Sequence, residues 1–161
     1  MSKIKFLSSA ILSTNCFLCD ANQTKNHGLC EACLKDLPWL PANSCPQCGL
    51  SSSGQVCGSC LSAPPYFDAT HAVFLYSYPV DAMIQRYKYG DALSLSHAFG
   101  QLISEKIGLI GNANNIDLII PMPMHPARLK QRGFNQALEI AKITDRVLNK
   151  NTKAKLDYKS V

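Results

Sequence analysis

Eight cysteines carry the clearest chemistry in this sequence of 161 residues, and all of them lie within the first 60. They form four pairs with identical C-x-x-C spacing: Cys16/Cys19, Cys30/Cys33, Cys45/Cys48 and Cys57/Cys60. This spacing lets two thiolates reach one tetrahedral ion, and two pairs complete a four-thiolate shell. Pairing in chain order therefore predicts two closed Zn²⁺ sites, which would stabilise a small fold and would not catalyse a reaction.

Two other uses of the cysteines stay open. An even number of cysteines also suits a disulfide scaffold. A redox C-x-x-C or an iron–sulfur centre uses the same residue type, but a thioredoxin-like site needs one such motif and not four in tandem. Zinc is the prediction that the regular spacing favours, and it implies a reducing compartment, the cytoplasm. Pro46 and Gly49 in CPQCG predict a tight turn between two ligands.

A second chemical signal lies in the stretch 121–136, PMPMHPARLKQRGFNQ. It carries Arg128, Lys130 and Arg132 between an apolar run and a predicted helix, and the free N–H groups of a helix N-terminus attract anions. Arginine adds a planar fork that matches phosphate, and Gly133 allows either a close approach of the backbone to a ligand or a left-handed turn. The stretch predicts a site for phosphate, pyrophosphate or a nucleic-acid backbone. A solvated basic loop followed by a capped helix remains the alternative.

The elements that would position these groups can be predicted from periodicity. Val80, Met83, Ile84 and Tyr87 have helical spacing before Gly90, and a second helix with apolar residues 99–107 is expected to end at Gly108. A third helix is expected over 134–149, with Asn135 as its cap. Strands are expected at 70–78 and at 116–120, the latter buried on both faces.

Alternating strands and helices predict an α/β region with a parallel sheet. Pro64-Pro65 indicates a linker. We therefore expect a module over 1–63, made of an N-terminal helix and a double zinc ribbon, and an α/β domain over 64–161. Residues 1–14 hold two lysines and a short apolar stretch broken by serines, without a signal-peptide cleavage site, so they predict an amphipathic helix.

Net charge and hydropathy exclude further classes of protein. The chain has a net charge of +5 and 47% apolar residues, which excludes an intrinsically disordered protein. No apolar run reaches the roughly 18–20 residues of a membrane span. Residues 121–161 hold nine Lys and Arg against three Asp and Glu. Contact with single-stranded DNA, if any, would use the basic residues of this part: Lys142, Arg146, Lys150, Lys153, Lys155 and Lys159.

Several motifs together resemble one known family. They are CFLC…LCEACLKDLPWLP…CPQCGL…VCGSC, then YKYGD, then IIPMPMHPARLKQRGFNQALEIA. This series is similar to the ComF family of bacterial competence-related proteins, which includes ComFC-like and GntX-like members, and the similarity covers essentially the whole chain. The resemblance implies a zinc ribbon joined to a type I phosphoribosyltransferase-like domain. It also implies a role in the uptake or use of external DNA, with proteins of the competence machinery as partners.

The resemblance assigns roles to particular residues. Pro121, Met122 and Pro123 match the loop that approaches pyrophosphate in phosphoribosyltransferase-like folds. The implied ligand is phosphoribosyl pyrophosphate or another phosphate compound, with Mg²⁺ needed only by an active transferase. The expected phosphate-binding residues match the family's hallmark loop and a recurrent lysine: Arg128, Arg132, Gly133, Asn135, Gln136 and Lys88.

The sequence departs from the family pattern at its end. The family continues with a strand and a V-D-D…T-T-G loop that holds ribose and the 5′-phosphate, and no such segment occurs here. We therefore expect a C-terminally truncated domain that ends without a closing strand, and its catalytic activity is doubtful. Two alternatives stay open: a zinc-ribbon nucleic-acid-binding module without catalysis, and an active phosphoribosyltransferase if a full-length form exists.

Overall fold

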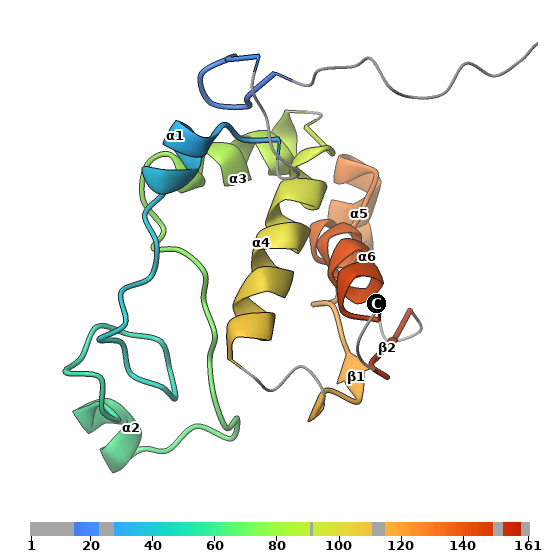
Figure 1. Cartoon of the computed structure of the whole chain (residues 1–161). Coiled ribbons are helices and arrows are strands. Elements are labelled where there is room, and N and C mark those ends of the chain that lie inside the picture. The colour runs from blue at the N-terminus through green and yellow to red at the C-terminus, as the bar shows by residue number, and fades with distance from the viewer. Residues whose placement is uncertain (1–14, 23–27, 91, 111–114, 150–152, 159–161) are drawn as a thin grey trace, which may run out of the picture.

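The computed structural model describes residues 15–22, 28–90, 92–110, 115–149 and 153–158. The helix expected within residues 1–14 lies outside these ranges. The described chain forms six α-helices and a two-stranded sheet (Figure 1). In chain order they are α1 Glu31–Lys35, α2 Gly58–Ser62, α3 Val80–Tyr89, α4 Leu95–Leu109, β1 Leu118–Ile119, α5 Pro126–Arg132, α6 Gln136–Leu148 and β2 Lys155–Leu156.

The three long helices agree with the apolar periodicity. α3 ends at Gly90, as expected, where the Gly90 N–H bonds to the carbonyl of Arg86. α6 begins after Asn135, whose side chain accepts from the N–H groups of Ala137 and Leu138, so the predicted cap is confirmed. α4 does not stop at Gly108 but runs through it to Leu109, because one glycine only weakens a helix.

α4 and α6 lie side by side and form the centre of the molecule (Figure 1). Their closest approach is at Gly100, where an added Cβ would lie 2.5 Å from the Cβ of Ile143. Thr144 on α6 is buried nearby, and its hydroxyl donates to the carbonyl of Ile140. A residue without a side chain at position 100 therefore allows the two helices to pack closely.

One hydrophobic core joins the first cysteine-rich segment to the long helices. Leu29 and Leu37 are 0% and 4% exposed and belong to the same buried cluster as Met83 of α3 and Leu95 and Phe99 of α4. Tyr87 stacks at an angle on Phe99, with ring centroids 5.9 Å apart. The segment around the first four cysteines thus shares its apolar interior with the region that follows residue 64.

The sheet is smaller than the sequence suggests. β1 pairs with β2 in parallel, with Leu118 opposite Lys155 and Ile119 opposite Leu156, so a strand does occur in the C-terminal stretch where none was expected. The expectation that 116–120 is buried on both faces is wrong. Leu118 is 49% exposed and Ile120 is 59% exposed, because no further layer of the described chain covers them.

The strand expected at 70–78 is also wrong in its extent. The segment contributes only a single antiparallel bridge, between Phe74 and Trp39. Hydrogen bonds from Leu40 N–H to the Val73 carbonyl and from Leu75 N–H to the Pro38 carbonyl use one backbone edge. A β-branched and aromatic composition favours a strand, but a strand also needs neighbours on its edges.

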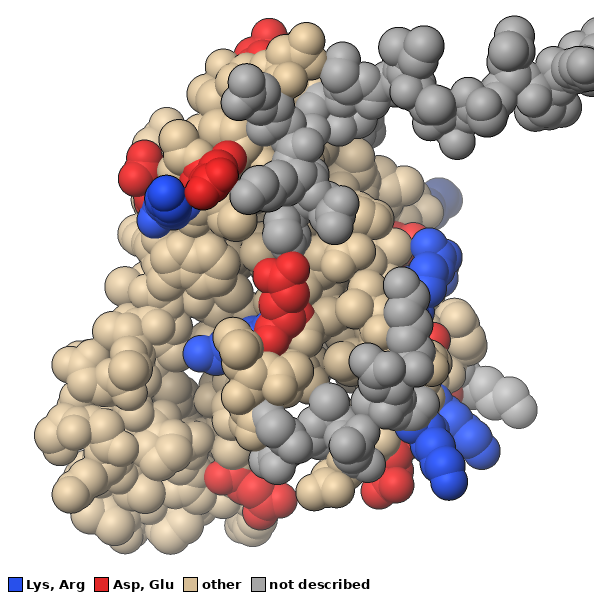
Figure 2. Space-filling view, viewed as in Figure 1, with Lys and Arg blue, Asp and Glu red and all other residues tan. Residues whose placement is uncertain are grey.

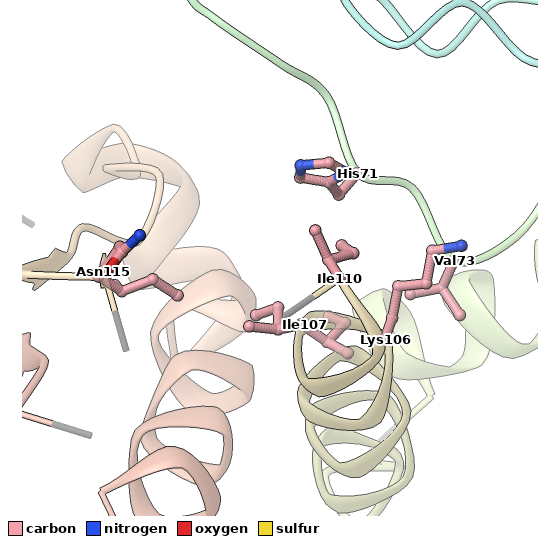
Figure 3. Close-up of a pocket in the computed structure, with 8 residues that line it drawn as sticks. His71, Val73, Lys106, Ile107, Ile110 and Asn115 are labelled. Carbon is pink, nitrogen blue, oxygen red and sulfur yellow. The ribbon is translucent and has the colours of Figure 1, made fainter. Parts of the chain in front are cut away.

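A hollow of about 430 Å³ separates this segment from β1. Figure 3 shows His71 and Val73 on one side of it and Asn115 on the other, with Ile107 of α4 and Ile110, the residue after that helix, between them. A second, larger cavity of about 520 Å³ runs along the same segment and is lined mainly by apolar side chains of α3, α4 and α6. The face of α4 next to segment 71–76 is therefore only partly covered.

Candidate zinc and anion sites

The eight cysteines lie in two clusters that follow chain order. Cys16, Cys19, Cys30 and Cys33 form the first cluster, and their sulfur atoms all lie within 4.8 Å of one another. Cys45, Cys48, Cys57 and Cys60 form the second, within the same limit. None of the eight takes part in a disulfide bond. We call these clusters site 1 and site 2.

The geometry of both clusters fits a tetrahedral zinc ion. Four sulfurs at a Zn–S distance of about 2.3 Å would lie about 3.8 Å from one another. The Sγ atoms of Cys19 and Cys30 are 3.6 Å apart, and those of Cys48 and Cys57 are 3.7 Å apart. These distances are much longer than a disulfide bond and close to the edge of a zinc–thiolate tetrahedron.

The protonation chemistry of the clusters also suits a cation. Backbone N–H groups of Cys48 and Cys57 lower the pKa of the Cys45 thiol to about 6. Burial raises the pKa of Cys60 to about 12, and neighbouring thiols add to that effect. Like charges this close disfavour a second thiolate, so a divalent cation among the sulfurs is what lets all four lose their protons.

Site 1 has the same pattern. Burial raises the pKa of Cys16, but backbone hydrogen bonds from Cys30, Cys19 and Leu18 outweigh it and lower that pKa to about 6. Burial, and then the neighbouring thiols, raise the pKa of Cys33. Each cluster therefore contains at least one thiol with a lowered pKa and at least one with a raised pKa, and a divalent cation would favour the thiolate form at such a site.

The two sites are built from the same local structures. In the first C-x-x-C pair of each site, the residue after the second cysteine adopts a left-handed conformation: Asp20 has φ +61° and Gly49 has φ +77°. The N–H groups of these residues bond to the carbonyls of Cys16 and Cys45, which closes the predicted knuckle turn. In the second pair of each site, the first cysteine precedes a short helix, α1 or α2. The sequence analysis missed both short helices.

The two sites differ in their surroundings. Cys16 and Cys30 of site 1 belong to the hydrophobic core that includes Met83 and Phe99. Site 2 lies in a separate lobe around α2, where residues 37–67 hold no Asp, Glu, Lys or Arg. Figure 2 shows this lobe as uncharged surface, whereas Lys and Arg gather over α5, α6 and β2.

The RGFNQ segment lies between two helices. The predicted loop contains a helix that sequence analysis missed. This helix, α5, spans Pro126–Arg132 and has Gly133 as its C-cap. Gly133 has φ +78°, the left-handed conformation predicted for it. Asn135 connects the segment to the strand before it, because its Nδ2 donates to the carbonyl of Met122 over 3.1 Å while its Oδ1 caps α6.

Four of the six expected phosphate-binding residues line one cleft of about 450 Å³ at the N-terminus of α6. Arg128, Arg132, Asn135 and Gln136 contribute to it together with residues 122–125. The other two do not: Gly133 ends α5, and Lys88 lines the neighbouring apolar cavity, which shares Gln136 with the cleft. In the described part of the chain, neither Arg128 nor Arg132 forms an ion pair with a carboxylate.

Two tyrosines of α3 hold this segment, and sequence analysis missed both. The Tyr87 hydroxyl donates to the carbonyl of Gln136 over 2.9 Å, and its ring packs on Phe134 with centroids 5.8 Å apart. The Tyr89 hydroxyl accepts from Nη2 of Arg132, also over 2.9 Å. The YKYGD motif contains both tyrosines, but the family resemblance assigns a binding role only to its lysine, Lys88.

Two buried nitrogens in this region are unpaired. Among the described residues, Nε of Arg132 and Nε2 of Gln136 have no hydrogen-bond partner, and Gln136 is only 7% exposed. A buried donor without an acceptor costs about 1–3 kcal/mol. Both side chains line the cleft, so an oxyanion there could accept from them.

Comparison with known proteins agrees with the cysteine geometry. Residues 7–61 match the family model of the double zinc ribbon domain. Together with the two four-sulfur clusters, this match defines the N-terminal region as two zinc-ribbon-like sites. The chain is thus a double-zinc-ribbon protein whose ribbons are followed by a region of helices and a small parallel sheet.

Three curated proteins are similar to this chain over most of its length. The chain is 30% identical to competence protein F of Haemophilus influenzae over 128 residues, which are 76% of this chain and 55% of that protein. It is 27% identical to the DNA utilization protein YhgH of Salmonella typhimurium over 128 residues, 76% of this chain and 56% of that protein. It is also 23% identical to competence protein ComFC of Bacillus subtilis over 150 residues, 81% of this chain and 62% of that protein. These similarities, together with the double zinc ribbon match, support the resemblance to the ComF family that the motifs indicated.

The matches cover only part of each relative. The chain spans about half the length of the first relatives that it matches. No solved structure matches it. In the part of the chain that the structure describes, no helix combines the length and hydropathy required to cross a membrane.

Proposed function

We propose that this chain takes part in the uptake or use of external DNA, and that it does so through a phosphate-binding α/β region held next to a double zinc ribbon. The names of its relatives, competence protein F and DNA utilization protein, support the first part. The single observation that supports the second is the cleft at the start of α6, where two arginines lack carboxylate partners among the described residues and the buried Nε2 of Gln136 lacks a hydrogen-bond partner. In this proposal the eight cysteines hold two structural Zn²⁺ ions.

We further propose that residues 64–161 form part of a phosphoribosyltransferase-like domain, and that residues 1–63 form the zinc module. The parallel pairing of β1 with β2 across α6 is a β-α-β arrangement, which supports an α/β class. The exposed Leu118 and Ile120 and the hollow over α4 (Figure 3) are what a sheet with additional strands would cover. Determining the coding sequence beyond the codon for Val161 tests whether a V-D-D…T-T-G segment follows.

The phosphate cleft is tested by calorimetric titration of the zinc-loaded chain with inorganic pyrophosphate at low salt. Arg128 lines the cleft, is exposed and forms no side-chain hydrogen bond or ion pair among the described residues, so Arg128→Ala should weaken binding by about tenfold without affecting the fold. Lys130→Ala is the matched control, because Lys130 is equally exposed on the same helix but does not line the cleft. Equal affinities of the two variants, or no binding by the unmodified chain, would exclude the cleft.

Catalysis by a phosphoribosyltransferase, with phosphoribosyl pyrophosphate and Mg²⁺, belongs to this proposal only for a longer form of the protein. The cleft supplies phosphate-type donors but no pair of acidic residues: its lining holds no Asp or Glu. Two carboxylates would be needed for the ribose hydroxyls that the resemblance assigns to the V-D-D segment. We also propose a cytoplasmic location, because zinc held by thiolates suits a reducing compartment.

A second candidate function is binding of single-stranded DNA by the basic C-terminal residues, without catalysis. Arg146, Lys153 and Lys155 are exposed, which favours it. Lys142 is less available, because its Nζ lies 2.6 Å from a carboxylate oxygen of Glu139. Lys150 and Lys159 lie outside the described residues. Affinity for an oligonucleotide measured against salt concentration tests the idea, and a log–log slope near zero would exclude it.

A further inference from the structure

Tyr89 is the last residue of α3, and its side chain is 66% exposed, yet it contacts Arg132 in two ways. Its hydroxyl oxygen lies 2.9 Å from Nη2 of Arg132, which donates to it. The centre of the same guanidinium lies 5.0 Å from the centroid of the Tyr89 ring, within range of a cation–π interaction. The two residues are 43 positions apart in the sequence, so the contact is tertiary.

A second acceptor holds the other end of the guanidinium. Nη1 of Arg132 donates to Oε1 of Gln136 over 3.3 Å. Gln136 is itself held by α3, because its carbonyl accepts from the Tyr87 hydroxyl. Arg132 is therefore oriented by Tyr89 on one side and by Gln136 on the other. Both acceptors are neutral, so the positive charge of the guanidinium is not cancelled by a carboxylate.

This arrangement leaves specific donors for a ligand. Nε of Arg132 and Nε2 of Gln136 are buried and lack partners among the described residues, and both side chains line the cleft. An arginine that is already oriented loses less rotamer freedom when it binds an oxyanion, so more of its interaction energy appears as affinity. Such an arrangement favours a ligand with phosphate-type oxygens over a neutral one.

We propose that Tyr89 is a positioning residue of this site: through its hydroxyl and its ring it holds Arg132 in the orientation that binds phosphate-type oxyanions. This inference rests on the proposed phosphate-binding function of the cleft. Tyr89 does not line the cleft, so its effect on the ligand passes through Arg132. Since its side chain is largely exposed and absent from the hydrophobic core, its replacement should not unfold the protein.

The test is a double-mutant cycle on the zinc-loaded full chain, with inorganic pyrophosphate as the probe and calorimetry as the readout. Tyr89→Phe keeps the ring and loses the hydroxyl, and we expect about threefold weaker binding. Tyr89→Leu loses both contacts, and we expect about tenfold weaker binding, so the conservative variant rescues part of the effect. Tyr89→Leu should change nothing further when Arg132 is already alanine.

The controls separate positioning from folding. Tyr66→Leu replaces a tyrosine that is fully exposed in the linker, and it should bind pyrophosphate as the unmodified chain does. The thermal midpoint and the zinc content of all variants should match those of the unmodified chain, because the core and the cysteines are intact. A purely structural role of Tyr89 would lower the thermal midpoint along with the affinity.

Each other result contradicts a specific step. If the unmodified chain does not bind pyrophosphate, the proposed function of the cleft is wrong and this inference falls with it. If the unmodified chain binds but Tyr89→Leu stays within twofold of it, the cleft stands and the positioning role is wrong. If Tyr89→Leu weakens binding equally in the Arg132→Ala background, Tyr89 acts on the ligand independently of Arg132, and the inference is again wrong.

Discussion

Loss of zinc from site 1 should unfold the long helices, whereas loss of zinc from site 2 should unfold only its own lobe. Cys19→Ser and Cys48→Ser form a matched pair for this prediction, because each removes the second cysteine of the first pair in its site. Cys19 is exposed and Cys48 is half-buried, so neither substitution removes a fully buried side chain. The variants then differ mainly in which metal site they open.

The expected magnitudes follow from the contacts of each site. Opening site 1 releases Leu29 and Leu37 from the core shared with α3 and α4, and burial of an aliphatic side chain contributes about 2 kcal/mol. These two leucines alone therefore account for about 4 kcal/mol, before any loss at their partners. Domains of this size are stable by only about 5–15 kcal/mol, so Cys19→Ser should remove most of the folded population.

Site 2 is connected to the rest of the molecule through backbone hydrogen bonds and through the Trp39 ring, whose centroid lies 4.9 Å from that of Phe74. Leu40 and Leu75 exchange bonds with Val73 and Pro38, and Thr70 N–H bonds to the carbonyl of Pro46 over 3.3 Å. Each such bond contributes about 1 kcal/mol, so opening site 2 should cost the long helices less than about 3 kcal/mol. No cysteine of site 2 belongs to the core cluster of the described residues.

The assay combines zinc release after denaturation, helical circular dichroism and amide hydrogen exchange. The unmodified chain should release about two Zn²⁺ per chain and each variant fewer. Cys48→Ser should keep the helical signal and the slow exchange of α4 amides, whereas Cys19→Ser should lose both. If the two variants lose helical signal equally, or if Cys19→Ser retains protected α4 amides, the argument from the shared core is wrong.

Three further predictions concern single contacts. Gly100→Ala should lower the free energy of unfolding by about 1–3 kcal/mol in denaturant titration, because its new Cβ would meet Ile143 at 2.5 Å. Asn135→Ala should cost about 1–2 kcal/mol in the same assay, because the cap of α6 is lost. Burial raises the pKa of Tyr87, and Glu139 adds to that effect. Its stabilising contribution is therefore complete below pH 10, the pKa of an ordinary tyrosine, and is lost as the pH rises above it. Tyr87→Phe should accordingly make unfolding less sensitive to pH above 10.

Each of these predictions has a control residue of the same type elsewhere in the described chain. Gly108→Ala adds a Cβ that would meet nothing within 4 Å, so it should leave α4 intact or stabilise it. Tyr76→Phe removes the hydroxyl of an exposed tyrosine and is the control for Tyr87→Phe. Asn149→Ala removes an exposed amide at the other end of α6 and should cost less than Asn135→Ala. If a control matches its test variant, the contact named for that variant does not explain the effect.

The cysteine sites show which features of a metal site can be predicted from local sequence and which cannot. A C-x-x-C pair brings two sulfurs together within one turn of chain, so the chemistry of each pair is decided locally. Which pairs share an ion depends on folding, and here the chain-order pairing holds because the connections between pairs are short. The unequal packing of the two sites could not be predicted, because Leu29 and Leu37 meet Met83 and Phe99 only in the tertiary structure.

In the phosphate cleft, the residues that are close in sequence could be predicted, but the contact from α3 could not. Arg128, Arg132, Asn135 and Gln136 lie within nine residues of one another, so their presence at one helix start was visible in the sequence. Lys88 was expected beside them and lines a different cavity, while its neighbour Tyr89 makes the contact with Arg132. Adjacent residues on a helix point in different directions, and only the packing of α3 decides which of them reaches the loop.

The sequence by itself determined the three long helices, the cap at Asn135 and the left-handed turn that Gly133 allows, because each depends on residues within a few positions. The extent of the strands was decided by tertiary structure. Segment 70–78 has the composition of a strand, but a strand requires a continuous hydrogen-bonding neighbour, and among the described residues this segment forms only one antiparallel bridge, between Phe74 and Trp39. The exposure of β1 was also decided by tertiary structure. The composition of a segment indicates that its residues favour burial, but it does not show whether another layer covers them.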